Sequence, residues 1–209
     1  MTTLQQILKH KIVAIIRGAS PDSVLEIAEA LHKGGVRCLE ITLNSADALK
    51  VIENIAIKMG DRIIVGAGTV LDAAEVSDAF AAGAKFIISP ILNSDIINKT
   101  KELGAVSIPG AFTPTEIFNA YSNGADIVKV FPGTGGPGFI REVLAPLLHI
   151  PLMPTGGVSL ENIHEFKKAG AVAFGIGKSL VDTKQKINDK YLQEIIMNAQ
   201  KFMQLANQS

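Results

Sequence analysis

The chain has 209 residues, of which 47% are hydrophobic, and its formal net charge is zero. This length suits one large domain or two small ones, and the balanced charge argues against nucleic acid or a membrane surface as a partner. No segment approaches the roughly 18 apolar residues of a membrane span, the first residues lack a signal-peptide layout, and the single Cys38 fits a reducing compartment, so we expect a cytoplasmic protein.

Short apolar, β-branched runs alternate along the chain with stretches of helical period. The N-terminal residues 2–10 predict a short helix. The stretch 20–35 begins with Ser20 and Pro21 and ends at two glycines, which is typical of a helix with ordinary caps. Further helices are expected at 113–125 and at the amphipathic 185–207. Eight apolar runs predict strands at 11–17, 37–43, 62–70, 85–90, 105–112, 126–132, 151–157 and 171–177.

Strands that alternate with helices favour parallel pairing and right-handed crossovers. Eight such units predict one domain over residues 1–209, a single (β/α)8 TIM barrel of near-minimal size with an N-terminal helix across its bottom. An open doubly wound sheet is the alternative fold. It usually has fewer strands, and no G-x-G-x-x-G follows the first strand here.

Two charged residues interrupt apolar strands, Lys129 in "DIVKVFP" and Glu40 in "CLEIT". Burying an unpaired charge costs several kcal/mol or more of folding free energy, so each of the two residues needs a partner or a functional role. One interpretation is a structural ion pair. The other is Schiff-base chemistry, in which a desolvated lysine attacks a ketone and a carboxylate moves protons.

Glycine-rich segments follow the last two predicted strands. Their backbone amides could form an anion cradle, which many barrels use for phosphate at this place, or the glycines could simply make tight turns. We favour the phosphate site, with the residues Thr155, Gly156, Gly157, Gly177, Lys178 and Ser179.

The four histidines precede strands or fall in helices, and none lies at the carboxyl end of a strand. With no cluster of histidine or cysteine, a catalytic transition metal is not expected.

In their order along the chain, "LEITL", "VGAGTV", "ISP", "VKVFP", "PTGGV" and "GIGKSLV" resemble the class I 2-keto-3-deoxy-6-phosphogluconate (KDPG) aldolase family, which includes the 4-hydroxy-2-oxoglutarate (KHG) aldolases. The resemblance runs from Lys11 to about Val181. It implies a (β/α)8 fold, a covalent lysine Schiff base without metal, and a homotrimer. The implied substrates are a 2-keto acid and an aldehyde phosphate.

The resemblance also implies a role for each matching residue. Lys129 is the Schiff-base former and Glu40 the general acid and base. Thr69 contacts the substrate carboxylate, Pro90 and Phe131 wall the pyruvate pocket, and the "TGG" residues with Ser179 hold phosphate.

One departure from the family pattern concerns the substrate carboxylate. Many members have an arginine soon after "LE-x-TL", where this chain has Asn44. Arg17 ends the first predicted strand, and we expect it to supply the missing charge through bidentate hydrogen bonds.

The expected reaction is cleavage of 2-dehydro-3-deoxy-6-phosphogluconate to pyruvate and glyceraldehyde 3-phosphate, with 4-hydroxy-2-oxoglutarate as a possible second substrate. "TLNS" is also seen in relatives that act on the phosphogalactonate epimer, so 2-dehydro-3-deoxy-6-phosphogalactonate is the first alternative. The others are a sugar-phosphate isomerase, epimerase or synthase barrel without a Schiff base, and a non-catalytic protein in which Lys129 and Glu40 form a structural pair.

Overall fold

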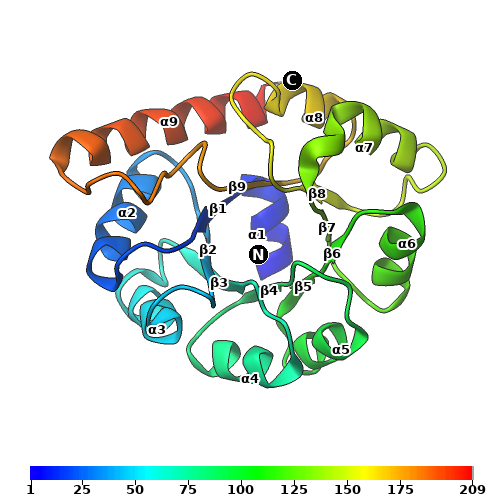
Figure 1. Ribbon diagram of the computed structural model, residues 1–209, viewed down its shortest axis with the longest axis horizontal. Helices are drawn as coiled ribbons and strands as arrows, with labels where there is room; N and C mark the ends of the chain where they lie inside the picture. Colours follow the sequence, from blue (N-terminus) through cyan, green and yellow to red (C-terminus); the bar gives the residue numbers. More distant parts are fainter. Residues whose placement is uncertain (209) are drawn as a thin grey trace.

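The computed structural model describes residues 1–208 as an α/β fold in which parallel strands lie inside a ring of helices (Figure 1). Each strand matches one of the apolar runs, because these runs are rich in the β-branched residues that favour strands. The strands are β1 (Ile12–Ile16), β2 (Cys38–Thr42), β3 (Ile64–Gly68), β4 (Phe86–Ile88), β5 (Val106–Ile108), β6 (Gly110–Ala111), β7 (Val128–Val130), β8 (Leu152–Pro154) and β9 (Phe174–Ile176).

The strands pair in two parallel sheets. One sheet has the order β5-β4-β3-β2-β1-β9 and the other the order β6-β7-β8. Sequential strands are neighbours, and the last strand pairs with the first, with Val13 opposite Gly175. A doubly wound sheet would instead reverse its order at a switch point, so that alternative is wrong. What is observed is a curled parallel sheet.

The fifth predicted strand, residues 105–112, is not one strand. It divides at Pro109 into β5, which pairs with β4, and β6, which pairs with β7. Proline has no N–H to donate to a ladder, so the pairing is interrupted there. Between β8 and β9, one isolated parallel bridge joins Thr155 to Gly175.

The helices cover the outside of the strands, and the larger buried core lies between the two layers. In α2, Val24, Ile27, Ala28 and Leu31 are all buried, as their spacing predicts. The helices are α1 (Thr3–His10), α2 (Pro21–Lys33), α3 (Ala48–Met59), α4 (Ala73–Ala81), α5 (Ser94–Glu102), α6 (Pro114–Ser122), α7 (Gly136–Leu144), α8 (Ile163–Lys168) and α9 (Asp189–Asn207), with a 3-10 turn η1 (Gly133–Gly135).

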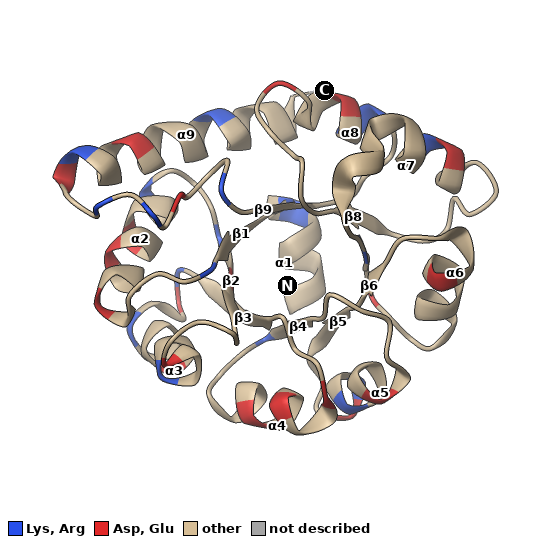
Figure 2. Ribbon diagram, in the orientation of Figure 1, with Lys and Arg blue, Asp and Glu red and all other residues tan. Residues whose placement is uncertain are grey.

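A second buried cluster fills the space enclosed by the strands. Ile7 of α1 packs there against Val13, Cys38 and Phe86, which stand at or near the amino ends of their strands. The predicted N-terminal helix is therefore present and covers that end. Most charged residues lie in the outer helices and the loops, and few lie in the strands (Figure 2).

No helix in residues 1–208 is both long and apolar enough to cross a membrane.

Candidate active site

Lys129 and Glu40 are both buried inside the ring of strands. Lys129 is the middle residue of β7 and is 3% exposed, and Glu40 is the middle residue of β2 and is 0% exposed. Side chains alternate along a strand, so Lys129 shares a face with Phe131 and Glu40 shares a face with Thr42. The fold thus brings together the two charges that the sequence singled out.

Burial sets the charge state of each group. Desolvation lowers the pKa of the Lys129 ammonium, although the Glu40 charge opposes that shift; the Arg17 charge lowers the lysine pKa further. Desolvation also raises the pKa of the Glu40 carboxyl, against the opposing charges of Lys129 and Arg17. The net effect shifts the lysine toward the neutral amine, which is the nucleophilic form.

The Glu40 carboxyl makes no hydrogen bond within residues 1–208, although both of its oxygens are buried. No ion pair within 4.0 Å joins it to Lys129 in the same part of the chain. Buried polar atoms are nearly always hydrogen-bonded in folded proteins. A carboxyl without partners is ready to accept a hydrogen bond from a bound molecule or a water.

Gly68 provides the space for the Glu40 side chain, and the sequence analysis missed this residue. A Cβ at Gly68 would lie 1.8 Å from Glu40 Oε1, which no real contact allows. Gly68 lies on the neighbouring strand β3, opposite Thr42. The sequence signal for Gly68 is the repeated glycine in "GAGT". Gly66 and Gly68 lie two residues apart, on the strand next to the one that carries the buried glutamate.

Of the other predicted residues, Phe131 lies beside the lysine, Pro90 packs on the neighbouring strand β6, and Arg17 contacts Thr69. The Lys129 Nζ lies 4.8 Å from the centroid of the Phe131 ring. Gly110, the register partner of Lys129, packs so closely on Pro90 that a Cβ would lie 2.5 Å from the Pro90 backbone. Arg17 follows β1, and its Nη2 donates a long hydrogen bond of 3.5 Å to Thr69 Oγ1.

Thr69 has an unusual backbone conformation directly after β3. Its φ is 57°, in the left-handed region that β-branched residues rarely adopt. Strain of this kind costs about 1–3 kcal/mol and is concentrated at functional sites. In this conformation the Thr69 hydroxyl accepts the long hydrogen bond from Arg17.

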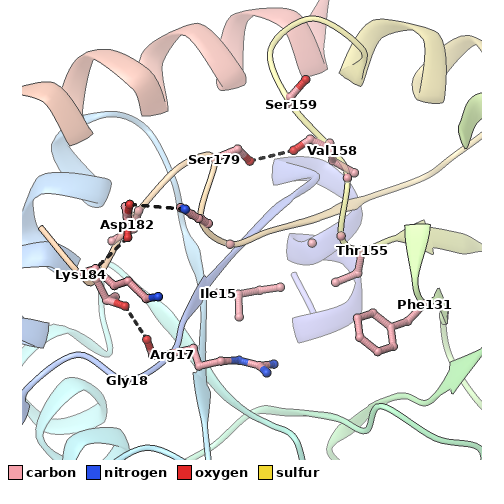
Figure 3. Close-up of a pocket in the computed structure, with 17 residues that line it drawn as sticks. Ile15, Arg17, Gly18, Phe131, Thr155, Val158, Ser159, Ser179, Asp182 and Lys184 are labelled. Carbon is pink, nitrogen blue, oxygen red and sulfur yellow. Dashed lines mark hydrogen bonds and ion pairs between the residues drawn. The ribbon is translucent and has the colours of Figure 1, made fainter. Parts of the chain in front are cut away.

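A pocket of about 720 Å³ opens beside these residues (Figure 3). This volume falls within the usual range for a small-molecule site. The side chains of Ile15, Arg17, Thr155 and Phe131 converge on it. All six predicted phosphate residues line it, namely Thr155, Gly156, Gly157, Gly177, Lys178 and Ser179, whereas Lys129, Glu40, Thr69 and Pro90 are not among its lining residues.

The glycine-rich loops of this pocket present backbone amides that have no partner. Within residues 1–208, the amides of Gly157, Lys178 and Ser179 make no hydrogen bond to protein. Gly157 has a φ of +78°, which a residue with a Cβ adopts only with strain. Free amides in such turns bind anions.

Two of the predicted phosphate side chains are already engaged. The Ser179 hydroxyl donates to the Val158 carbonyl at 2.8 Å, so its amide is the donor that remains. The Lys178 Nζ lies 3.9 Å from an Asp182 carboxylate oxygen and is largely exposed. The backbone therefore offers the better-placed donors.

A segment after β9, residues 182–184, also lines the pocket and was missed by the sequence analysis. Thr183 Oγ1 donates to the Arg17 carbonyl at 2.6 Å and so fixes the Arg17 backbone. The Asp182 amide donates to the Tyr191 hydroxyl of α9 at 2.7 Å. This segment belongs to no strand or helix, so no periodic pattern reveals it.

No group of three or more His, Cys, Asp or Glu in residues 1–208 is arranged to hold a metal ion. His10 ends α1, His32 and His164 lie in helices, and His149 precedes β8, as the sequence predicts.

A buried lysine and glutamate next to a pocket lined by unpartnered backbone amides, on a curled parallel sheet, suit an enzyme that acts on a phosphorylated carbonyl compound. The family model described as "KDPG and KHG aldolase" matches residues 4–197. The chain belongs to this aldolase family. The resemblance noted in the sequence is confirmed, and the chain is a carbon–carbon lyase of this type.

Individual relatives of the aldolase family agree over most of their length. The 2-dehydro-3-deoxy-6-phosphogalactonate aldolase of Escherichia coli (strain K12) is 34% identical over 181 residues, which are 86% of this chain and 88% of the relative. The 2-dehydro-3-deoxy-phosphogluconate aldolase of Haemophilus influenzae (strain Rd) is 35% identical over 170 residues, covering 78% and 80%. A solved structure described as native KDPGal superposes with a TM-score of 0.87, 32% identity and 93% coverage of both chains.

Proposed function

We propose that this protein is a class I aldolase that cleaves 2-dehydro-3-deoxy-6-phosphogluconate into pyruvate and glyceraldehyde 3-phosphate through a Schiff base on Lys129. The observation that carries the proposal is the pairing of a buried lysine, whose pKa is lowered, with a buried carboxyl that has no hydrogen bond. A structural ion pair would bring the two groups into contact. Here each is left available.

The first half of the reaction forms the iminium. The neutral Lys129 amine attacks the C2 ketone, and the carbinolamine loses water to give an iminium ion. The positive iminium then accepts the electron pair of the C3–C4 bond. Glu40 takes the proton of the C4 hydroxyl, directly or through a water, and glyceraldehyde 3-phosphate leaves.

The second half restores the enzyme. Cleavage leaves a pyruvate enamine on Lys129, which is protonated at C3 and becomes an iminium again. Water hydrolyses the iminium, pyruvate leaves, and the amine is free. No external oxidant, reductant or metal enters these steps, and the lysine is the only covalent participant.

The substrate would extend from Lys129 into the 720 Å³ pocket. Arg17 and Thr69 would bind the carboxylate, and Pro90 and Phe131 would enclose the pyruvate carbons. The amides of Gly157, Lys178 and Ser179 would hold the phosphate. Fixing the remote phosphate aligns the C3–C4 bond over the iminium and contributes to the rate.

The phosphogalactonate epimer is a second candidate substrate. It is favoured by the 34% identity to the E. coli phosphogalactonate aldolase and by Asn44 in "TLNS". The unphosphorylated 4-hydroxy-2-oxoglutarate, cleaved to pyruvate and glyoxylate, is a third. Parallel assays of pyruvate release from the three compounds will rank them by kcat/KM.

The test of the proposal is trapping of the Schiff base. The protein is incubated with pyruvate and sodium borohydride, and intact mass and peptide mapping are recorded. We expect one reduced pyruvyl group on Lys129 and none in Lys129→Met. A folded protein without an adduct would refute the Schiff base and favour an isomerase-like phosphate barrel.

We propose also that the two sheets close into one (β/α)8 barrel. Pro109 alone separates β5 from β6, and the bridge between Thr155 and Gly175 connects β8 to β9. A closed barrel would explain why β9 pairs with β1.

A homotrimer in the cytoplasm completes the proposal. Phe118 and Tyr121 of α6 are exposed, and Phe112 stacks on Phe139 of α7. Leu148 is 81% exposed, and the next residue, His149, contacts Tyr121. Copies of the chain would bury this aromatic face, defined by Phe112, Phe118, Tyr121, Phe139 and Leu148. The buried free thiol of Cys38 is in keeping with a reducing compartment.

A further inference from the structure

A second pocket, of about 480 Å³, lies at the amino ends of the strands, where α1 covers the ring. It is built from α1, the end of α2, the residue before β2, the end of α3 and the segment after it, the beginning of β3, and the segment before β4. The first pocket, of about 720 Å³, is lined instead by residues at or after the carboxyl ends of the strands. Nothing in the proposed reaction uses this second pocket.

Positive groups from separate elements line it. Arg37 precedes β2 and Lys85 precedes β4, and neither forms an ion pair within residues 1–208. Arg37 Nη1 donates to the carbonyls of His32 and Val36, at 2.9 and 3.0 Å, which orients the guanidinium. Its Nε and Nη2 donate to no protein oxygen in that part of the chain, so one edge of the guanidinium is free.

The third cation of the pocket, Arg62, is already paired. Its Nη1 lies 3.0 Å from Glu29 and its Nε 3.6 Å from Asp61. Asp61, the carboxylate among the lining residues, is thus paired with Arg62, as is Glu29. Within residues 1–208, Arg37 and Lys85 form no ion pair.

Two imidazoles, His10 of α1 and His32 of α2, complete the lining. Burial lowers the pKa of His10, and the charges of Arg37 and Lys9 lower it further. Burial also lowers the pKa of His32, with Arg37 and Arg62 outweighing the opposing Glu29 and Asp61. Among the lining side chains, the cations Arg37, Arg62 and Lys85 outnumber the one carboxylate, Asp61, so the net charge around the pocket is positive and complements an anion.

We propose that this pocket binds a small dianionic phosphate, free or as a phosphate ester, between Arg37, Lys85 and the imidazoles of His10 and His32. The free edge of a guanidinium offers two parallel donors, which match two oxygens of a phosphate. The lysine adds a point charge at the rim. The imidazoles add further donors when protonated.

Histidine side-chain NMR tests the proposal with inorganic phosphate as the probe. The chain has four histidines, of which His149 and His164 lie outside the pocket and serve as internal controls. Phosphate is titrated at constant ionic strength against sodium chloride. We expect the His10 and His32 signals to move saturably and their pKa values to rise on binding, while His149 and His164 stay unchanged.

Substitutions locate the site. Lys85→Ala removes an exposed, unpaired cation and should weaken phosphate binding about tenfold, by the loss of a charged hydrogen bond. Arg37→Ala should weaken phosphate binding more, but it also removes the hydrogen bonds to the His32 and Val36 carbonyls at the end of α2. If the Arg37→Ala variant does not fold, Lys85→Ala decides the test. Lys33→Ala, a matched charge loss on α2 outside the pocket, should leave binding unchanged.

Two results would overturn the proposal. One is a response of His10 and His32 that follows ionic strength alone, or that Lys33→Ala weakens as much as Lys85→Ala. The other is saturation by succinate or citrate but not by phosphate, which would assign a carboxylate ligand instead. Phosphate bound in the aldolase pocket would not move these two histidines, so failure here leaves the proposed function untouched.

Discussion

Lys129 and Glu40 show how one environment shifts two opposite groups toward neutrality. Each is almost fully buried, and desolvation is the largest cause of both pKa shifts. Their mutual attraction works against desolvation, so the two titrate as a coupled pair. Desolvation has the larger effect on both pKa values, and within residues 1–208 neither group forms an ion pair that would stabilise its ionised form.

Replacement of Glu40 by Gln keeps the shape of the side chain and removes the proton acceptor. We expect the fold to persist and turnover of the phosphorylated substrate to fall by roughly two to four orders of magnitude. Because the Glu40 charge raises the Lys129 pKa, its loss should also move the pH dependence of borohydride trapping to lower pH. Steady-state kinetics and trapping across pH measure both, and a fully active variant would refute the assigned role.

Arg17 is expected to bind the substrate carboxylate in place of the arginine that Asn44 replaces. Loss of charge-assisted hydrogen bonds in Arg17→Ala should lower kcat/KM by about 10- to 100-fold, mainly through KM. Arg17→Lys keeps the charge without the fork and should recover only part of the loss. Arg141→Ala, an exposed arginine in α7, is the control, and unchanged KM and kcat in Arg17→Ala would end this assignment.

The charged site residues could be predicted from the sequence because each breaks a local rule. Lys129 and Glu40 are charged residues in apolar strands, and a charge is rarely buried there unless it has a partner or a function. Thr183 could not be found in this way. It acts through a hydrogen bond to the Arg17 carbonyl, 166 positions away along the chain, and its own surroundings are ordinary polar loop.

Most strands and helices can be predicted from the sequence, because hydrophobic periodicity and the positions of glycines mark where each one runs and ends. The prediction of a single fifth strand was wrong at Pro109, where the missing N–H divides the ladder. The last helix begins at Asp189, after the Asn188 cap, and not at residue 185. Such caps depend on hydrogen bonds that composition alone does not reveal.

Strand β3 is expected to tolerate no side chain at Gly68. A methyl group there would meet the Glu40 carboxylate, so Gly68→Ala should displace that side chain and lower turnover as strongly as Glu40→Gln. Activity and thermal denaturation measure the effect. Gly138→Ala in α7 is the control, because nothing lies within 4 Å of a Cβ there, and it should stabilise the helix by about 0.5–1 kcal/mol. Normal activity in Gly68→Ala would show that Glu40 has no fixed role.

At the scale of the molecule, the sequence predicts a single-domain parallel α/β fold because each strand is followed by a helix. It does not predict how the edges of the two sheets meet, since that depends on side chains packed across the ring. Nor does it predict the assembly, because single exposed apolar residues are common on monomers as well. The proposed aromatic face draws on residues of α6, α7 and the segments beside them, and the stacking of Phe112 on Phe139 becomes visible only in the structure.

The proposed trimer should have a mass three times the 22.1 kDa of the chain in size-exclusion chromatography with light scattering. Phe118→Asp places a charge in the aromatic face and should yield monomers, because a desolvated unpaired carboxylate opposes association. Met197→Asp, at a comparably exposed methionine in α9, should remain trimeric. A wild-type protein that runs as a monomer contradicts the trimer, and a trimeric Phe118→Asp places the interface elsewhere.

The absence of hydrogen bonds to Glu40 has a consequence for timing. A carboxyl fixed by donors serves one atom in one direction, and turning it means breaking those bonds. No donor of residues 1–208 holds the Glu40 carboxyl, so a change in its orientation would break no hydrogen bond to protein. In the proposed reaction, one group could then take the proton of the C4 hydroxyl and later deliver a proton to the enamine carbon, so that a single residue would serve both halves of the cycle.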